Sequence, residues 1–374
     1  MIGGGQLARM CAGPAAELGI TLAVLAESAD ASAALVTPFA PVGDHADVDA
    51  VREFAAACDV VTFDHEHVPA EVLQALVEDG VQLHPRPAAL TYAQDKLAMR
   101  RRLTELGLPC PRWSAATTVN QARSFGDQVG WPIVAKTPRG GYDGKGVRMT
   151  DCAEELSDWF DLARGKGEPL LLEERIPYTR ELAILIARSP SGQAAAWPVV
   201  ETIQTDGICT EVLAPAPDLT PEVAELATRI GLDLAGALEI TGVFAVELFE
   251  TARGPLVNEL AMRPHNSGHW SMDGAVTGQF EQHLRAVLDL PLGSPRAKAP
   301  FTVMANVLGG QHEDLYPAYR HLMARDPELK VHLYGKSVRP GRKIGHVNVS
   351  GADLADLCDR ARHAADYLQG VVTE

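Results

Sequence analysis

The stretch "KTPRGGYDGKGV", residues 136–147, constrains the fold of this chain more tightly than any other. Four of its twelve residues are glycine and three are cationic. Glycine loses more conformational freedom on folding than any other residue, so a glycine cluster weakens the element that contains it. The residues before and after it are apolar, which predicts two strands joined by a hairpin loop. The loop is either a plain surface hairpin or a flexible cationic flap that closes over an anion.

Length and charge narrow the class of protein. A chain of 374 residues is too long for one ordinary core and predicts two or three domains. Its 46% hydrophobic and 22% charged content is typical of a soluble globular protein. The net charge of −16 argues against nucleic acid as a partner, because nucleic-acid binding needs a basic surface. Any anion would therefore be bound in a locally cationic pocket.

The sequence also bears on compartment. No apolar run approaches the roughly 20 residues that cross a bilayer, so we expect no membrane partner. The N-terminus lacks the basic and apolar regions of a signal peptide. The six cysteines are scattered and include no CxxC pair, which favours reduced thiols over a zinc site or a disulfide framework. These features predict a cytoplasmic protein.

The chain divides into three predicted domains. Residues 1–92 alternate short apolar strands (21–25, 60–63, 81–83) with helical stretches (47–58, 69–78), a βαβ succession that implies a parallel sheet. Only Met1 and Ile2 precede the first glycine turn, so we expect the first strand to be clipped or to begin upstream.

Residues 93–295 are predicted as an α+β domain with a lid subdomain at about 112–175, and residues 296–374 as a small β-rich C-terminal domain. The elements expected here are helices at 94–106, 220–236, 277–290 and 353–368 and strands at 132–136, 170–174, 242–249 and 256–260.

"GGGQLA", residues 3–8, fits the G-x-G-x-x-A turn of dinucleotide-binding proteins. Such a turn places a helix N-terminus against a phosphate, and Glu27 supplies the acidic residue expected at the end of the next strand. A tight strand-to-helix turn without a ligand explains the same residues equally well.

The glycine loop at 140–146 is not a Walker A motif, because Gly146 leads into a predicted strand and not into a helix. Lys136 ends the preceding strand, so its ammonium can reach phosphates beneath the loop. Backbone amides freed by the glycines could hold further phosphate oxygens.

Two glutamates lie in strands that are otherwise apolar. Glu247 falls in "AVELF" and Glu259 in "LVNELAMRP", and a buried charge is costly without a partner. On adjacent strands the two carboxylates could converge on one Mg²⁺, which prefers a few carboxylates plus phosphate oxygens. Ion pairing with nearby Arg263 is the alternative, and the residues alone weigh the two equally.

Three further segments collect polar side chains. "RPHNSGHW" (263–270) lacks an HExxH pattern, which favours substrate contacts over zinc. "DHEHVP" (64–69) follows a buried strand, where parallel sheets bind ligands, so Glu66 is a substrate-site candidate and His65 and His67 are ordinary loop residues. "YGKSVRPGRKIGH" (334–346) is either a solvated basic loop or a phosphate anchor.

These segments, with "EERIPYTRE" and "QFEQHLRAV", resemble the N5-carboxyaminoimidazole ribonucleotide synthetase family of the ATP-grasp superfamily over nearly the whole chain. The resemblance implies an ATP-grasp fold of mixed α/β and α+β class, with an N-terminal Rossmann-like parallel-sheet domain. It implies a ligase of de novo purine biosynthesis that carboxylates 5-aminoimidazole ribonucleotide with bicarbonate and ATP, through carboxyphosphate. It also implies a homodimer that uses Mg²⁺, or Mn²⁺ in its place.

The resemblance assigns roles to residues of this sequence. Nucleotide contacts would come from Lys96, Lys136, Gly141, Tyr142, Asp143, Gly144, Lys145, Gly146, Val147, Glu173, Glu174, Arg175, Ile176, Glu181, Gln204, Asn258 and Glu259. Substrate contacts would come from Gln6, Leu7, Glu66, His265, Asn266, Lys336 and Arg342. The reacting groups would meet Tyr142, Asp143, Lys145, Glu66, Arg263 and Lys336, and the metal would meet Glu247 and Glu259.

Departures from the family pattern leave every charged site position intact. "DHEHVP" replaces a Phe-Glu-Asn-Val-Pro-like stretch, Met262 stands where proline is customary, and Ala8 stands where glycine is. Three other functions are considered: a formate-using ATP-grasp ligase of purine synthesis, a nicotinamide-dependent oxidoreductase built on "GGGQLA", and a noncatalytic nucleotide sensor. The last is disfavoured by the intact Lys136, Glu247 and Glu259.

Overall fold

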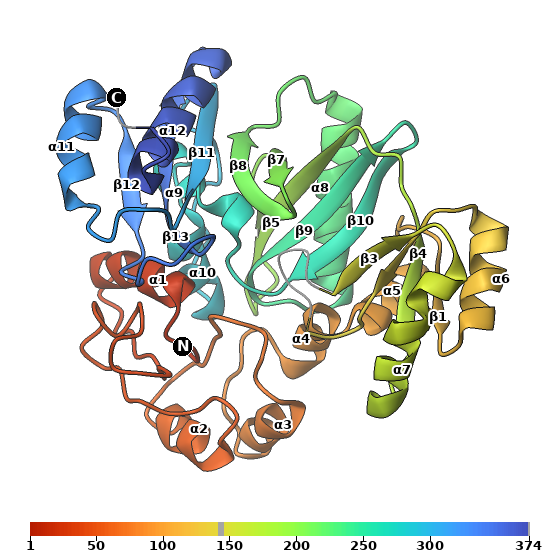
Figure 1. Ribbon diagram of the computed structural model, residues 1–374. Coiled ribbons are helices and arrows are strands. Elements are labelled where there is room, and N and C mark those ends of the chain that lie inside the picture. Colours follow the sequence, from red (N-terminus) through yellow and green to blue (C-terminus); the bar gives the residue numbers. More distant parts are fainter. Residues whose placement is uncertain (141–145, 373–374) are drawn as a thin grey trace.

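The computed structural model describes residues 1–140 and 146–372. A central antiparallel sheet stands in the middle, with the N-terminal helices α2 and α3 below it (Figure 1). The lid helices α6 and α7 lie on one side of this sheet and the C-terminal helices α11 and α12 on the opposite side (Figure 1). None of the helices in the described part of the chain combines the length and the apolar character that crossing a membrane requires.

The N-terminal section has the predicted parallel arrangement, although its strands are reduced to single bridges. Ile2 bridges Leu25 and Phe63 in parallel, and Val61 bridges Leu83. Even two residues before the glycine turn are therefore enough for the first strand to join the sheet. The helices of this section are α1 (Gln6–Glu17), α2 (Val48–Ala55), α3 (Ala70–Glu78) and α4 (Pro87–Gln94).

The helix predicted over 94–106 is wrong at its start. Gln94 ends α4, and α5 begins one residue later as Lys96–Glu105. Asp95 is extended between them and caps α5, because its carboxylate accepts hydrogen bonds from the amides of Leu97 and Ala98. A side-chain cap of this kind satisfies amides that have no partner inside the helix.

The lid has its own four-stranded sheet in the order β1-β4-β2-β3 and its own apolar core around Phe125, Ile133 and Leu172. Strands β2 and β3 form the predicted hairpin, since Lys136 pairs with Val147 across its open end. The elements of the lid are β1 (Trp113–Ala116), α6 (Val119–Val129), β2 (Ile133–Lys136), β3 (Val147–Thr150), η1 (Ala153–Leu156), α7 (Ser157–Lys166) and β4 (Leu170–Glu174).

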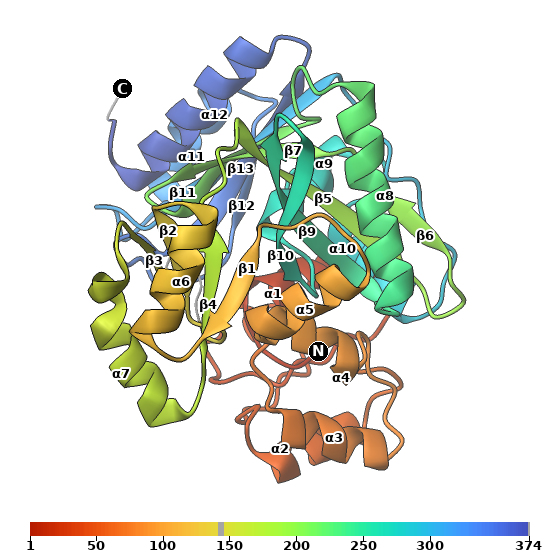
Figure 2. The same cartoon turned by 90° about the vertical axis from the view of Figure 1, so that its right-hand side faces the viewer.

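The central sheet runs β10-β9-β5-β7-β8-β11-β13-β12, with β6 on β5. Helix α8 lies along one face of it (Figure 2) and begins at the predicted cap, Thr220, whose hydroxyl accepts the amide of Val223. The elements are β5 (Arg180–Arg188), β6 (Ala194–Ala196), β7 (Val200–Thr205), β8 (Ile208–Ala214), α8 (Pro221–Ala237), β9 (Gly242–Thr251), β10 (Gly254–Ala261), η2 (Asn266–Gly268), α9 (Ser271–Gly274) and α10 (Gln279–Val287).

The C-terminal section extends this sheet. Its first strand pairs with β8 from Thr302 opposite Ala214 to Ala305 opposite Glu211. Its apolar core also includes Leu213 of β8. The section consists of β11 (Phe301–Leu308), α11 (Tyr316–Arg325), β12 (Lys330–Leu333), β13 (Lys343–Gly351) and α12 (Leu354–Gln369).

Candidate active site

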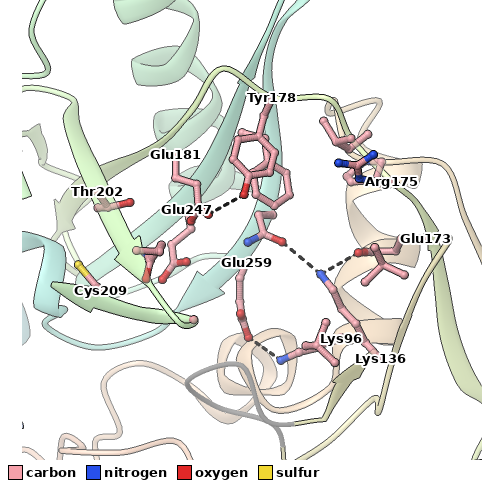
Figure 3. Close-up of a pocket in the computed structure, with 18 of the residues that line it drawn as sticks. Lys96, Lys136, Glu173, Arg175, Tyr178, Glu181, Thr202, Cys209, Glu247 and Glu259 are labelled. Atoms are coloured by element: carbon pink, nitrogen blue, oxygen red, sulfur yellow. Dashed lines mark hydrogen bonds and ion pairs between the residues drawn. The ribbon is translucent and has the colours of Figure 1, made fainter. Parts of the chain in front are cut away.

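The largest site lies between the lid and the central sheet. It is a cavity of about 760 Å³ lined by both halves of the predicted nucleotide set (Figure 3). The predicted residues that line it are Lys96, Lys136, Val147, Glu173, Glu174, Arg175, Ile176, Glu181, Gln204, Glu247, Asn258, Glu259, His265 and Asn266. The lid supplies the first group of these from β2, β3 and β4, and the sheet supplies the rest from β5, β7, β9 and β10.

A second cavity of about 600 Å³ adjoins the first. The two share Lys96, Glu247, Glu259 and His265, and the second adds the predicted residues Glu66 and Arg263. Because four polar side chains face both cavities, a group bound in one lies close to a group bound in the other.

The two predicted metal ligands face each other across neighbouring strands. Glu247 of β9 pairs in register with Glu259 of β10, and the register shifts between Val257 and Glu259. Glu259 accepts from the Lys96 ammonium at 2.5 Å, and Glu247 lies 3.1 Å from Nε2 of His265. Burial opposes ionisation of Glu247, but the hydrogen bond and charge of His265 lower its pKa.

Lys136 reaches across the cavity from the lid. Its ammonium lies 2.7 Å from Glu173 Oε2 and donates to Asn258 Oδ1 at 3.2 Å (Figure 3). Burial alone would raise the pKa of Glu173, yet the charges of Arg100 and Lys136 lower it. Since these two cations occupy the Glu173 carboxylate, a nucleotide would meet this residue through its backbone.

Arg100 was not predicted, and it is fully buried on α5. Its Nε donates to Glu173 at 2.5 Å and one Nη donates to the carbonyl of Asn258 at 2.8 Å, so it ties the lid to β10. A buried charge becomes very unfavourable when its partner is removed.

We expect Arg100→Leu to lower the free energy of unfolding by about 3–5 kcal/mol, because Glu173 would stay buried with Lys136 as its remaining cation. Arg102→Leu on the same helix is the matched control. Arg102 pairs with Glu105 at the surface, a contact worth about 0–1 kcal/mol. Urea denaturation measures both, and equal losses would contradict the assignment.

Glu66 and Arg263 form the pair that lines the second cavity. Glu66 accepts from Arg263 Nε at 2.8 Å and from the amide of Met262 at 2.9 Å. Burial would raise the pKa of Glu66, but the adjacent guanidinium outweighs it and lowers the pKa. The alternative pairing of Arg263 with Glu259 is therefore wrong, since the contact to Glu66 bridges segments 197 residues apart.

Four predicted substrate residues lie outside both cavities: Gln6, Leu7, Lys336 and Arg342. The structure brings two of them together, since Lys336 donates to Gln6 Oε1 at 2.5 Å. Arg342 donates to Ser337, and Leu7 is buried in an apolar cluster. Burial and then the charge of Arg342 lower the pKa of Lys336 to about 8.

The glycine turn at the start of α1 is occupied by the protein's own carboxylate. Asp64 accepts the amide of Ala8 at 2.7 Å, and a Cβ at Gly5 would lie 2.0 Å from Asp64 Oδ2. Burial raises the pKa of Asp64. The position where a dinucleotide phosphate would contact the helix is thus filled, which weakens the oxidoreductase hypothesis.

Glu27 accepts the amide of Gly4 and gathers with His45 and His65, whose nearest ligand atoms lie within 4.8 Å of one another. The His65 Nδ1 accepts the amide of His67 at 3.2 Å, so the neutral ring carries its proton on Nε2, facing Glu27. The hydrogen bond to His65 lowers the pKa of Glu27 to about 2. We therefore interpret the group as an ion-pair cluster, and His65 and His67 as loop residues.

Several residues that line the larger cavity were missed. Tyr178 stacks on Phe249 with ring centroids 4.6 Å apart and donates to Glu181 at 3.2 Å (Figure 3). Phe249 could have been found, because it lies two residues after Glu247 and so faces the same side of β9. The others gave no sequence signal: Pro111, Val134, Met149, Pro177, Thr202, Gly207, Cys209, Ser267 and Lys343.

Asn266 shows a polar group that lacks a protein partner. Both polar atoms of its side-chain amide are buried and have no hydrogen-bond partner among residues 1–140 and 146–372. Buried polar groups are normally satisfied, so an amide that lines a cavity in this state favours a polar ligand. The predicted contacts of Gly141, Tyr142, Asp143, Gly144 and Lys145 lie outside the described residues, while Gly146 closes the hairpin by accepting the amide of Thr137.

Known proteins resemble this chain along its whole length. Residues 1–94 match the ribonucleotide synthetase preATP-grasp domain, residues 101–280 the ATP-grasp domain, and residues 302–360 the phosphoribosylaminoimidazole carboxylase C-terminal domain. The N5-carboxyaminoimidazole ribonucleotide synthase of Mycobacterium tuberculosis strain H37Rv is 55% identical over 375 residues, which covers 98% of this chain and 87% of that protein.

Solved structures agree with these matches. An N5-carboxyaminoimidazole ribonucleotide synthetase in complex with ADP has a TM-score of 0.89 at 34% identity, covering 99% of this chain and 96% of that one. The Aspergillus clavatus N5-carboxyaminoimidazole synthase in complex with ADP and 5-aminoimidazole ribonucleotide has a TM-score of 0.87 at 29% identity, covering 98% of both chains.

Proposed function

The chain belongs to the N5-carboxyaminoimidazole ribonucleotide synthase family and is an ATP-dependent ligase, and we propose that it carboxylates 5-aminoimidazole ribonucleotide with bicarbonate. ATP becomes ADP and phosphate in this step of purine biosynthesis. The observation that carries the proposal is the pair of adjoining cavities that share Lys96, Glu247, Glu259 and His265.

The larger cavity holds ATP. Its base and ribose lie toward the lid-to-sheet connection, where Ile176 and the stacked Tyr178 and Phe249 give apolar surface and Glu181 accepts a ribose hydroxyl. Lys136 and Lys96 face the phosphates, because both ammonium groups point into the cavity at its other end (Figure 3). In the ligand-free arrangement these cations pair with Glu173 and Glu259, so phosphates exchange places with carboxylates as partners.

Mg²⁺, or Mn²⁺ in its place, fits between Glu247 and Glu259. Two carboxylates opposed on neighbouring strands, with Asn258 Oδ1 beside them, offer the hard oxygen atoms that Mg²⁺ prefers. When bound, the ion neutralises the charge of the transferring phosphoryl group. Lys96 and His265 now neutralise these carboxylates and would give them up to the ion.

The second cavity takes bicarbonate and the aminoimidazole ring. A bicarbonate oxygen attacks the γ-phosphorus and ADP leaves, giving carboxyphosphate; the exocyclic amine then bonds to the carboxyl carbon and phosphate leaves. Arg263 holds the anionic oxygens, and Glu66 fixes the guanidinium with two contacts to the same turn. His265 and Asn266 supply polar contacts at the junction of the two cavities.

The ribonucleotide phosphate is anchored by Lys336 and Arg342, which converge electrostatically with Lys343 near Asp64. Because burial lowers the Lys336 pKa to about 8, its ammonium is charged below that pH and neutral above it. We expect kcat/KM for the ribonucleotide to fall up to about tenfold per pH unit above 8, since kcat/KM reports the free enzyme. In Lys336→Arg this fall should move to higher pH, and an unchanged fall in that variant would contradict the anchor.

A comparison of co-substrates tests the proposal. ADP formation should require both bicarbonate and 5-aminoimidazole ribonucleotide, and formate should not replace bicarbonate. Formate-dependent turnover would instead assign the formate-using ligase, and nucleotide binding without turnover would assign the sensor. The homodimer and the cytoplasmic location are proposed from the family resemblance, and sedimentation of the purified protein tests the first.

A further inference from the structure

Gln279, the first residue of α10, is a polar side chain with no exposed surface. Burying an amide is unfavourable unless its hydrogen bonds are satisfied. Its amide makes three, and all three go to the segment 265–269: Oε1 accepts the His265 amide at 2.9 Å, and Nε2 donates to the His265 carbonyl at 2.9 Å and to His269 Nδ1 at 2.8 Å.

This geometry fixes one peptide segment from two sides. A single side chain takes both the N–H and the C=O of His265, as a paired strand would, so neither translation nor rotation of that residue is free. Burial holds the pKa of His269 well below its ordinary value, so its neutral ring is an acceptor for Nε2. The segment has no room to move away, because a Cβ at Gly268 would lie 2.6 Å from Gln279 Oε1 and 2.2 Å from Leu185.

The residue that is held in this way lines both cavities. His265 places Nε2 3.1 Å from Glu247 and Nδ1 2.9 Å from the Ser267 hydroxyl. We infer that Gln279 is a positioning residue of the carboxylation site, which holds the main chain of His265 so that its imidazole faces Glu247 and the bound substrates. The inference rests on the proposed function, which gives His265 its contact with substrate.

Helix α10 also carries a matched control. Gln282 is likewise fully buried, and its amide also takes both main-chain groups of one residue. It accepts the amide of Gly293 at 2.7 Å and donates to its carbonyl at 2.8 Å. Gly293 lies in the connection to the C-terminal section and lines neither cavity. Gln279 and Gln282 thus have the same burial and chemistry, but only Gln279 holds a residue of the site.

The experiment compares Gln279→Leu and Gln282→Leu with His265→Ala and the double variant Gln279→Leu/His265→Ala. We expect Gln279→Leu to lower kcat/KM for the ribonucleotide by about 10- to 100-fold, because a misplacement of about 1 Å has effects of that order. Gln282→Leu should change it by less than about threefold at a similar loss of melting temperature. In the His265→Ala background, Gln279→Leu should add no more than about twofold, because its effect passes through the missing imidazole.

Two results would overturn the inference: Gln279→Leu losing no more activity than Gln282→Leu, or losing the same factor with and without the His265 imidazole. If the leucine variants do not fold, the same comparison is made with Gln279→Glu and Gln282→Glu, which keep the acceptor and lose the donor. Failure of the proposed function is distinct, because the unaltered enzyme would then form no ADP with bicarbonate and ribonucleotide.

Discussion

Glu259→Gln is expected to lower turnover by about a hundredfold or more while the protein stays folded. The substitution keeps the size of the side chain and removes one of the two charges proposed to hold Mg²⁺. Stability should change little, because the Glu259 side chain is 40% exposed and its pair with Lys96 is partly solvated. Raising Mg²⁺ should recover part of the loss, whereas added ribonucleotide should not.

Glu250→Gln is the control, since Glu250 lies on β9 and pairs with Arg180 away from both cavities. It should keep turnover near normal even if it lowers the melting temperature. A folded Glu259→Gln enzyme with near-normal turnover at low Mg²⁺ would contradict the metal assignment.

Lys136→Met is expected to lower kcat/KM for ATP by about 100- to 1000-fold, because it removes the ammonium that faces the phosphates from the lid. Folding should survive, since Arg100 still neutralises the buried Glu173 carboxylate. Lys136→Arg retains the charge with a different shape and should keep part of the activity. Normal steady-state kinetics of Lys136→Met at low ATP would show that this lysine does not bind the phosphates.

The metal pair shows how far the sequence could be used. Two charges in apolar strands predicted that Glu247 and Glu259 converge, and the register confirms that they lie opposite each other. The shift between Val257 and Glu259 is what sets this register. A bulge depends on how two strands meet, so the pattern of either strand alone does not reveal it.

Other features depend on contacts between distant segments. Arg263 pairs with Glu66, not with the nearer Glu259, because the turn after Phe63 meets the end of β10 only in the folded protein. Arg100 and Gln279 look like ordinary helix residues in the sequence, and their roles arise from partners on β4 and in the segment before α9. Asp95, by contrast, carried a local capping signal that a closer reading of "AQDKL" would have found.

The parallel N-terminal sheet and the antiparallel hairpin of the lid were predictable because hydrophobic runs and glycine turns are local signals. The continuity of the C-terminal strands with β8 was not, since the pairing of β11 with β8 joins segments separated by α8, β9 and β10.

Transfer of oxygen from bicarbonate to phosphate tests the central claim most directly. The enzyme is given ATP, 5-aminoimidazole ribonucleotide and ¹⁸O-labelled bicarbonate, and the released phosphate is analysed by mass spectrometry on a timescale shorter than label exchange with water. If bicarbonate attacks the γ-phosphorus, its oxygen stays on phosphorus when the carbon is transferred, so each phosphate formed with product should carry one labelled atom. Unlabelled phosphate formed at the same rate as ADP would mean that water is the phosphoryl acceptor, and would contradict the carboxylation mechanism.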